Sequence, residues 1–236
     1  MKYYELNSYI LARKNVFEAD KIITLFSYEM GKSQAIAKGV RLSKAKLAGN
    51  LEPFNKCKLR LVKGRNLDII VGVEPGKMHD YSRLTAERLQ VLYLISEILS
   101  RLSADHQPNT VAFDLFEESI DALIGSIDPV LIAQYFGLNF LQSIGSQPEL
   151  IDTKQHSRHY LAYDSGKITM LKPNSHYGII SEPTIKLWRL IVAHNITYIQ
   201  KITNLQKALE EGYKLMLHYY EYHFDFQPKS LKVFQD

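Results

Sequence analysis

The sequence predicts an α+β protein of two domains, in which a β-rich N-terminal domain precedes a mainly α-helical C-terminal domain. Short runs of β-branched and aromatic residues occupy the first part of the chain, whereas apolar residues three or four apart occupy the rest. The charge changes at the same place. Residues 1–80 carry 15 Lys or Arg and 8 Asp or Glu, and residues 81–236 carry 14 and 17. We therefore predict one domain over residues 1–80 and another over residues 81–236.

Five short strands are predicted in the first domain, within residues 9–12, 22–27, 33–40, 56–61 and 67–73. The segment Glu29-Met30-Gly31-Lys32 suits a hairpin turn between the second and third strands. In residues 56–61 three cations alternate with three apolar residues, so a strand here places the two sets on opposite faces. Five strands in about 75 residues match a small closed Greek-key barrel of the OB (oligonucleotide-binding) type.

Helices are predicted in the second domain from spacing and capping residues. Apolar residues line one face of a helix over residues 82–103, and another over residues 113–123 stops at Gly125. Asp128-Pro129 and Glu182-Pro183 each open a further helix, because proline suits the first helical position. A last helix begins near residue 205. Residues 142–181 are irregular, with strand-like pieces around residues 160 and 168.

The composition restricts the class of protein. Apolar residues make up 46% of the 236 residues, which is enough for well-packed cores. One cysteine, Cys57, permits neither an internal disulfide nor a cysteine-based zinc site and fits a reducing compartment. No run of about 18 apolar residues and no secretory signal is found, so we expect a cytoplasmic protein without a membrane partner.

The positive charge is concentrated in one segment. Residues 32–65 contain ten Lys or Arg and a single acid, Glu52, whereas the whole chain has a net charge of only +4. This distribution is typical of a protein that binds a phosphate backbone; the alternative is a solvated basic face with no partner. The cations are Lys32, Lys38, Arg41, Lys44, Lys46, Lys56, Lys58, Arg60, Lys63 and Arg65.

Other possible sites are weaker. Gly31-Lys32-Ser33 resembles the end of a P-loop, but Phe26 stands where the first glycine is required. His156, His159 and His176 lack a suitably spaced carboxylate for zinc and are interpreted as exposed loop residues. Neither Glu117-Glu118 nor Glu210-Glu211 forms a catalytic pair, because adjacent helical residues point to different sides. We therefore predict no catalytic residues, no metal and no cofactor.

Aromatic residues cluster near the C-terminus and could stack nucleobases, or could pack a terminal helix in the core. We favour core packing, because the cluster lies in the acidic part of the chain. Its members are Tyr213, Tyr219, Tyr220, Tyr222, Phe224 and Phe226.

Four segments of the first domain resemble, in order and spacing, the N-terminal signature of the bacterial recombination mediator family RecO. They are residues 18–26 (EADKIITLF), 31–32 (GK), 37–41 (AKGVR) and 47–54 (LAGNLEPF). The resemblance covers about residues 8–75, and the helical remainder is similar in length and layout. It implies an N-terminal OB domain followed by a helical domain.

The resemblance also implies a non-enzymatic function. Members bind single- and double-stranded DNA, anneal complementary strands and help to load RecA onto DNA coated by single-strand binding protein (SSB). The implied partners are RecR and the acidic C-terminal tail of SSB. By position, the family's basic surface corresponds to Arg13, Lys14, Lys38, Arg41, Lys44 and Lys46.

The second domain departs from the family in one respect. Many members carry a four-cysteine zinc module, whereas residues 138–171 contain no cysteine, and residues 160–171 are interpreted as a surviving hairpin. Lys186 and Arg189, three apart beside Trp188, are a candidate site for the SSB tail. Two alternative functions remain: an OB protein that binds RNA or single-stranded DNA without mediator activity, and a hydrolase with its site in residues 142–181.

Overall fold

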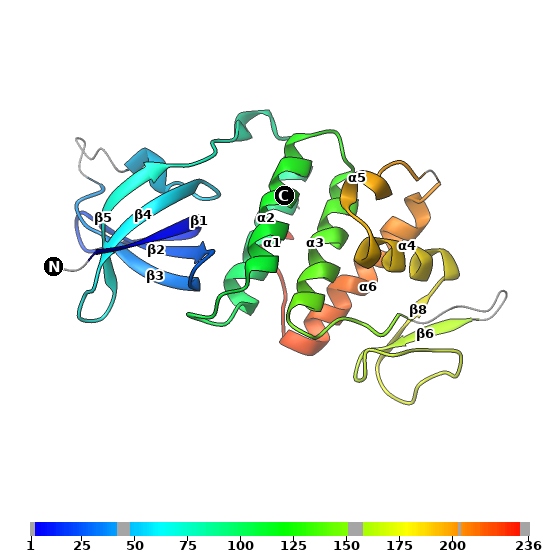
Figure 1. The fold of residues 1–236 in the computed structure, drawn as a ribbon. Helices are drawn as coiled ribbons and strands as arrows, with labels where there is room; N and C mark the ends of the chain where they lie inside the picture. The colour runs from blue at the N-terminus through cyan, green and yellow to red at the C-terminus, as the bar shows by residue number, and fades with distance from the viewer. Residues whose placement is uncertain (1–2, 42–47, 151–157, 203, 232–236) are drawn as a thin grey trace. The chain divides into compact units, whose positions relative to one another are not determined.

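The structure is a computed structural model that describes residues 3–41, 48–150, 158–202 and 204–231. It divides into two compact units (Figure 1). The first comprises residues 1–83 and 96–114, and the second comprises residues 84–95 and 115–236. The chain thus passes between the units three times, after residues 83, 95 and 114, and a domain boundary at residue 80 stays a prediction.

Five strands form a closed barrel in the first unit, drawn blue to cyan in Figure 1. Their order is β1-β2-β3-β5-β4, in which β3 and β5 are parallel and all other pairs are antiparallel. This confirms the predicted OB-like barrel. The strands are β1 (Tyr3–Val16), β2 (Asp20–Ser27), β3 (Gly31–Ala37), β4 (Lys56–Val62) and β5 (Asp68–Pro75), with the short helix η1 (Ala48–Leu51) between β3 and β4.

Alternation along the strands builds the barrel core. Cys57, Leu59 and Leu61 of β4 are buried, whereas Lys58 and Arg60 are exposed, as the sequence pattern predicts. β1 is longer than its predicted apolar run because it pairs with β4 through its first half and with β2 through its second half. β1 therefore has a paired strand on each side, which closes the barrel.

Helices form most of the chain after the barrel. They are η2 (Tyr81–Arg83), α1 (Ala86–Leu102), α2 (Thr110–Ile124), α3 (Pro129–Ser143), α4 (Glu182–Ala193), α5 (Ile196–Ile199), α6 (Gln206–Phe224) and η3 (Lys229–Leu231). Of these, α1, α2, α3, α4 and α6 correspond to the predicted helices. Asp128 caps α3 by accepting hydrogen bonds from the amides of Val130 and Leu131, as its position before proline predicts. α1 begins later than predicted, because the hydroxyl and carbonyl of Thr85 accept the first amide hydrogen bonds.

α3, α4 and α6 pack through small residues and aromatic rings. Gly137 of α3 lies against Met216 and Tyr220 of α6, and the hydroxyl of Tyr220 donates to the Gly137 carbonyl at 2.8 Å. Tyr219, Tyr220 and Phe226 are buried, so the prediction of core packing is confirmed for these members of the aromatic cluster. Tyr222 is 45% exposed.

The irregular segment contains more regular structure than predicted. β6 (His159–Ala162) pairs with β7 (Ile168–Thr169), which is the predicted hairpin, and with a third strand, β8 (Tyr177–Ile180), which the sequence analysis missed. The interpretation of His159 as exposed is wrong, because its alternation in β6 buries it. His176 is exposed, and His156 lies outside the described residues.

Candidate nucleic-acid interface

A polar cleft of about 480 Å³ lies on the outer face of β2 and β3, beside the β4–β5 connection. These elements form the oligonucleotide-binding face of OB folds. Thr24 of β2 and Gln34 of β3 pair across the strands, and the Gln34 amide donates to the Thr24 hydroxyl at 3.4 Å. Lys63 and Asn66 border the cleft from the connection. The lining therefore combines hydrogen-bond donors with two carboxylates, those of Asp68 and Asp105.

Lys32 enters this cleft but is already engaged. Its ammonium forms an ion pair with Asp105 at 3.2 Å and donates to the Ser100 carbonyl at 3.0 Å, and the side chain is 16% exposed. Gly31 precedes it with φ of +68° at the start of β3, so the P-loop-like tripeptide lies in a hairpin and not at a helix N-terminus. Lys32 thus has a structural role, and its contact with DNA stays a prediction.

Lys63 is also paired. Its ammonium donates to Asp68 at 2.9 Å and lies 4.9 Å from the centre of the Tyr4 ring. The Tyr4 hydroxyl donates to the same carboxylate, and burial together with this hydrogen bond raises the pKa of Tyr4. The side chain of Lys63 is nevertheless 72% exposed, so it can contact a ligand in the cleft.

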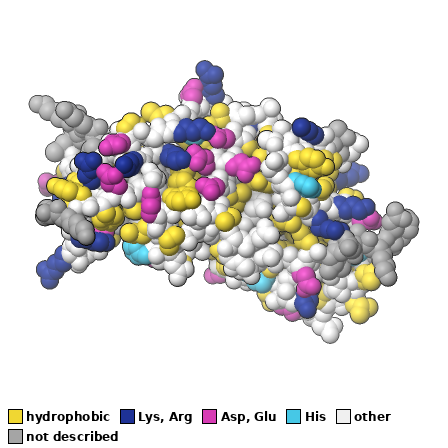
Figure 2. Space-filling view, viewed as in Figure 1, with side chains coloured by type: hydrophobic (Ala, Val, Ile, Leu, Met, Phe, Trp, Pro, Cys, Tyr) yellow, Lys and Arg dark blue, Asp and Glu magenta, His cyan; other side chains and the backbone are white. Residues whose placement is uncertain are grey.

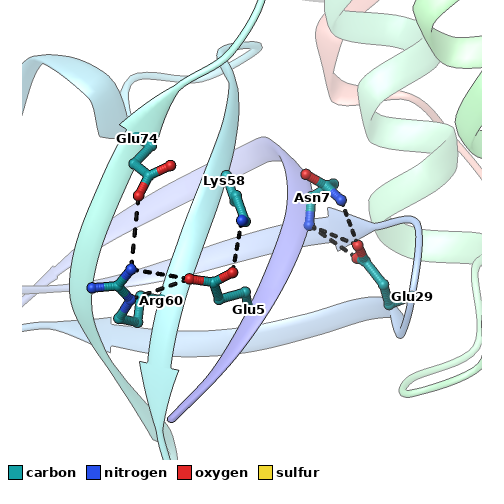
Figure 3. Close-up of polar contacts among 6 residues, drawn as sticks. All are labelled: Glu5, Asn7, Glu29, Lys58, Arg60 and Glu74. Atoms are coloured by element: carbon teal, nitrogen blue, oxygen red, sulfur yellow. Dashed lines mark hydrogen bonds and ion pairs between the residues drawn. The ribbon is translucent and has the colours of Figure 1, made fainter.

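The Glu5 carboxylate forms ion pairs with two cations of β4 (Figure 3). It accepts from Arg60 Nε and Nη2 at 3.2 and 3.1 Å and forms an ion pair with Lys58 at 2.7 Å. Glu74 of β5 adds a further ion pair to Arg60 at 3.8 Å. We call Glu5, Lys58, Arg60 and Glu74 the β4 ion-pair cluster. Two basic side chains are balanced here by two acids.

The cluster is intact at neutral pH. Hydrogen bonds from Lys58 and Arg60 hold the pKa of Glu5 below its ordinary value of 4.5, and the hydrogen bond to Glu5 raises the pKa of Lys58. Stabilisation by Glu5 is therefore present above pH 4.5 and is lost as the pH falls through the lowered pKa. Because all the partners are exposed, the pairs add little to folding and mainly compete with other ligands of the cations.

A two-stranded ribbon formed by the ends of β1 and β2 carries further cations. Residues 12–15 of β1 are all exposed, whereas Ile23 of β2, which pairs with Arg13, is fully buried. Arg13 forms an ion pair with Glu52. The Arg41 guanidinium donates to the Phe17 carbonyl at 3.3 Å, which ties the segment after β3 to the β1–β2 turn. Phe17, which the sequence analysis did not single out, is 82% exposed.

Three predicted contact residues remain available to phosphate. Lys14, Lys38 and Arg65 are exposed and form no ion pair with a residue in the described parts of the chain. Lys56 is half-buried, and its ammonium lies over the rings of Tyr9 and Phe113 at 5.7 and 5.5 Å. Lys44 and Lys46 lie outside the described residues. Figure 2 shows Lys and Arg interspersed with Asp and Glu on the visible face.

The structure corrects the predicted SSB-tail site at one of its three residues. Trp188 is fully buried, and its indole donates to the Gln134 side-chain oxygen at 3.0 Å, so the prediction that Trp188 contributes to a surface site is wrong. The reason is that its position in α4 faces α3 and α6. Lys186 and Arg189 are exposed, and Lys186 forms an ion pair with Glu182 at 2.6 Å.

Comparisons with known proteins decide the family. A family model described as "Recombination protein O N terminal" matches residues 1–78, and one described as "Recombination protein O C terminal" matches residues 83–232. The chain belongs to the recombination protein O (RecO) family. It is 26% identical over 216 residues to "DNA repair protein RecO" of Dehalococcoides mccartyi, covering 88% of this chain and 85% of the relative. It is also 26% identical over 242 residues to the protein of the same name from Desulforamulus reducens, covering 99% and 93%.

Membership of the RecO family supports a role in DNA repair and recombination, with DNA and proteins of that pathway as partners in general terms. RecO proteins are recombination mediators. Within the described residues, none of the helices has the length and apolar character needed to span a bilayer. In the same residues no group of three or more His, Cys, Asp or Glu is arranged to hold a metal ion.

Proposed function

We propose that this chain is a non-enzymatic DNA-binding mediator that binds single- and double-stranded DNA through the basic surface of its barrel. The observation that carries the proposal is the concentration of ten cations against one acid in residues 32–65, within a RecO-family barrel. The proposed DNA-binding surface comprises the cleft on β2 and β3 and the ribbon formed by the ends of β1 and β2. Its members without an ion pair to any described residue are Lys14, Lys38 and Arg65, which lie on or next to these two features.

The proposed mechanism is electrostatic. Lysine and arginine neutralise phosphates on two strands, or on one strand beside SSB, and thereby lower the repulsion between strands that must pair. Annealing of complementary strands and loading of RecA on SSB-coated DNA, together with RecR, follow from this role in the family. The contacts are to the backbone, so little sequence preference is expected.

The proposed contact with the acidic SSB tail is centred on Lys186 and Arg189, without Trp188. Both cations lie on the exposed side of α4, which makes them accessible to an acidic segment. The proposed place of action is the bacterial cytoplasm, at the nucleoid.

Annealing of two complementary oligonucleotides coated with cognate SSB, measured over a salt series, tests the proposal. We expect salt-sensitive acceleration by this protein. If about six phosphates are neutralised, log affinity for single strands falls with log salt at a slope near about −4. Salt-independent binding would contradict the mechanism. Salt-sensitive binding without annealing would instead support an OB protein that lacks mediator activity, and equal-length RNA and DNA competitors would then identify its ligand.

A further inference from the structure

Phe17 has an unusual position for a phenylalanine. It lies in the three-residue turn between β1 and β2, its side chain is 82% exposed, and its backbone has φ of +50°. A positive φ is unfavourable for a bulky residue and needs support from the surrounding structure. The ring makes no contact with another aromatic ring or a cation among the described residues. Neither local conformation nor core packing therefore accounts for a phenylalanine here.

The turn is held from a second segment of the chain. The amide of Arg41 donates to the Ala19 carbonyl at 3.1 Å, and its guanidinium donates to the Phe17 carbonyl at 3.3 Å. The Asp20 carboxylate accepts from the amide of Gly39 at 2.8 Å. These three hydrogen bonds fix the backbone on both sides of the turn. The exposed Phe17 ring is thus attached to a backbone whose conformation is fixed by hydrogen bonds.

Four cations lie near this turn, together with the exposed acid Glu18 of the turn itself and with Glu52, which pairs with Arg13. Arg13 and Lys14 lie at the end of β1 that leads into it, and Lys14 pairs with Ile22 in the ladder. Lys38 and Arg41 belong to the segment that holds the turn. An isolated ring among cations differs from a protein-docking patch, in which apolar residues are contiguous. Aromatic rings beside a basic surface are instead the combination that binds single-stranded nucleic acid.

We infer that Phe17 is a stacking platform for a nucleobase of single-stranded DNA. The inference rests on the proposed function, to which it adds a contact that distinguishes single strands from duplexes. In a duplex the faces of the bases are already stacked on their neighbours, whereas a single strand can offer a free face. The surrounding cations would hold the phosphates on either side of the stacked base.

The experiment compares wild type, Phe17→Ala and Phe17→Leu in binding three ligands of equal length: a single-stranded oligonucleotide, its abasic analogue and a duplex. Each ligand carries the same phosphates per strand, but the abasic strand has no base to stack. We expect both variants to bind the normal single strand at least about five-fold more weakly, because leucine has no aromatic face. Affinity for the abasic strand and the duplex, and the salt slope, are expected to remain unchanged.

Phe17→Trp provides a direct readout. The natural chain has one tryptophan, Trp188, which is fully buried and gives a constant background. We expect emission from the new tryptophan to be quenched by the normal strand and not by the abasic one. Tyr3→Ala is the matched control, because it removes a 58% exposed ring from the other end of β1. Circular dichroism confirms the fold of each variant.

Three outcomes would contradict the inference. Wild-type-like binding of the normal strand by Phe17→Ala would overturn stacking while leaving the proposed DNA binding in place. Equal losses on normal and abasic strands would also overturn it, because the loss would not depend on a base. Absence of salt-sensitive DNA binding by the wild type would overturn the proposed function and the inference together.

Discussion

Glu5 of β1 lies directly opposite Arg60 of β4, and one carboxylate oxygen of Glu5 accepts hydrogen bonds from both Nε and Nη2 of Arg60. The other oxygen is paired with Lys58 at 2.7 Å. Two of the cations that the sequence assigns to DNA are therefore already occupied by an acid of the same barrel. A phosphate that contacts them competes with Glu5, which leads to the first prediction.

Glu5→Gln is expected to strengthen DNA binding. The change releases Lys58 and Arg60 for two further phosphates, so the salt slope on single strands steepens by up to about 1.4 and affinity at low salt rises roughly three- to ten-fold. Fluorescence anisotropy over a salt series measures both quantities. Glu182→Gln, which removes an acid from an ion pair on α4, is the matched control. An unchanged slope in Glu5→Gln would show that the β4 face does not contact DNA.

Lys38→Gln combined with Arg65→Gln is expected to weaken DNA binding without loss of stability, because both side chains are exposed and unpaired within the described residues. Loss of two phosphate contacts reduces the salt slope by about 1.4 and the affinity roughly ten-fold. Anisotropy and thermal unfolding measure the two effects separately.

Lys32→Gln tests the opposite case, in which the lysine is already paired within the protein. It removes the ion pair to Asp105 and the hydrogen bond to Ser100, so it is expected to lower the free energy of unfolding by about 1 kcal/mol while changing the salt slope little. If Lys32→Gln instead kept full stability and lost DNA affinity, Lys32 would be a DNA contact and its structural role would be contradicted.

Gly212→Ala is expected to destabilise the second unit. A Cβ atom at this position in α6 would lie 2.3 Å from the Gln134 side-chain oxygen and 2.7 Å from the Trp188 indole nitrogen. The α3–α4–α6 packing must then shift, at a cost of about 1–3 kcal/mol in the free energy of unfolding. Urea unfolding followed by Trp188 fluorescence reports this loss. Gly125→Ala serves as the control, because its nearest neighbour would lie 3.4 Å away, and equal effects of the two changes would contradict the packing argument.

Cys57 is expected to be inert in the native protein. It is 2% exposed, and burial raises its pKa to about 12, so almost no thiolate is present at pH 8. A thiol reagent added at pH 8 should label it only after denaturation, when one thiol per chain reacts. Rapid labelling of the folded protein would show that the barrel opens readily at β4.

Lys186→Glu with Arg189→Glu is expected to weaken binding of a labelled acidic SSB-tail peptide at least about five-fold, because two cations exposed on α4 are replaced by acids. Anisotropy of the peptide measures this. Lys207→Glu with Lys214→Glu makes the same charge change on exposed positions of α6 and is expected to bind normally. Equal losses in the two double variants would indicate a general charge effect.

Features that depend on neighbours in the chain could be predicted before the fold was known. Alternation placed Cys57, Leu59 and Leu61 of β4 in the barrel core, and Asp128 before proline marked the start of α3. Strand number and spacing indicated the OB-like barrel, and the four N-terminal segments indicated the family. Periodicity and capping act over a few residues, so they can be read without knowing the fold.

Which cations are available and which aromatic rings are exposed could be learned only from the folded chain. Glu5 lies more than fifty positions before Lys58 and Arg60, yet the β1–β4 ladder brings them into contact. Trp188 is in the core and Phe17 on the surface, although both stand beside charged residues in the sequence. The physical reason is that ion pairing and burial depend on which distant strand or helix lies opposite, and no local pattern contains that information.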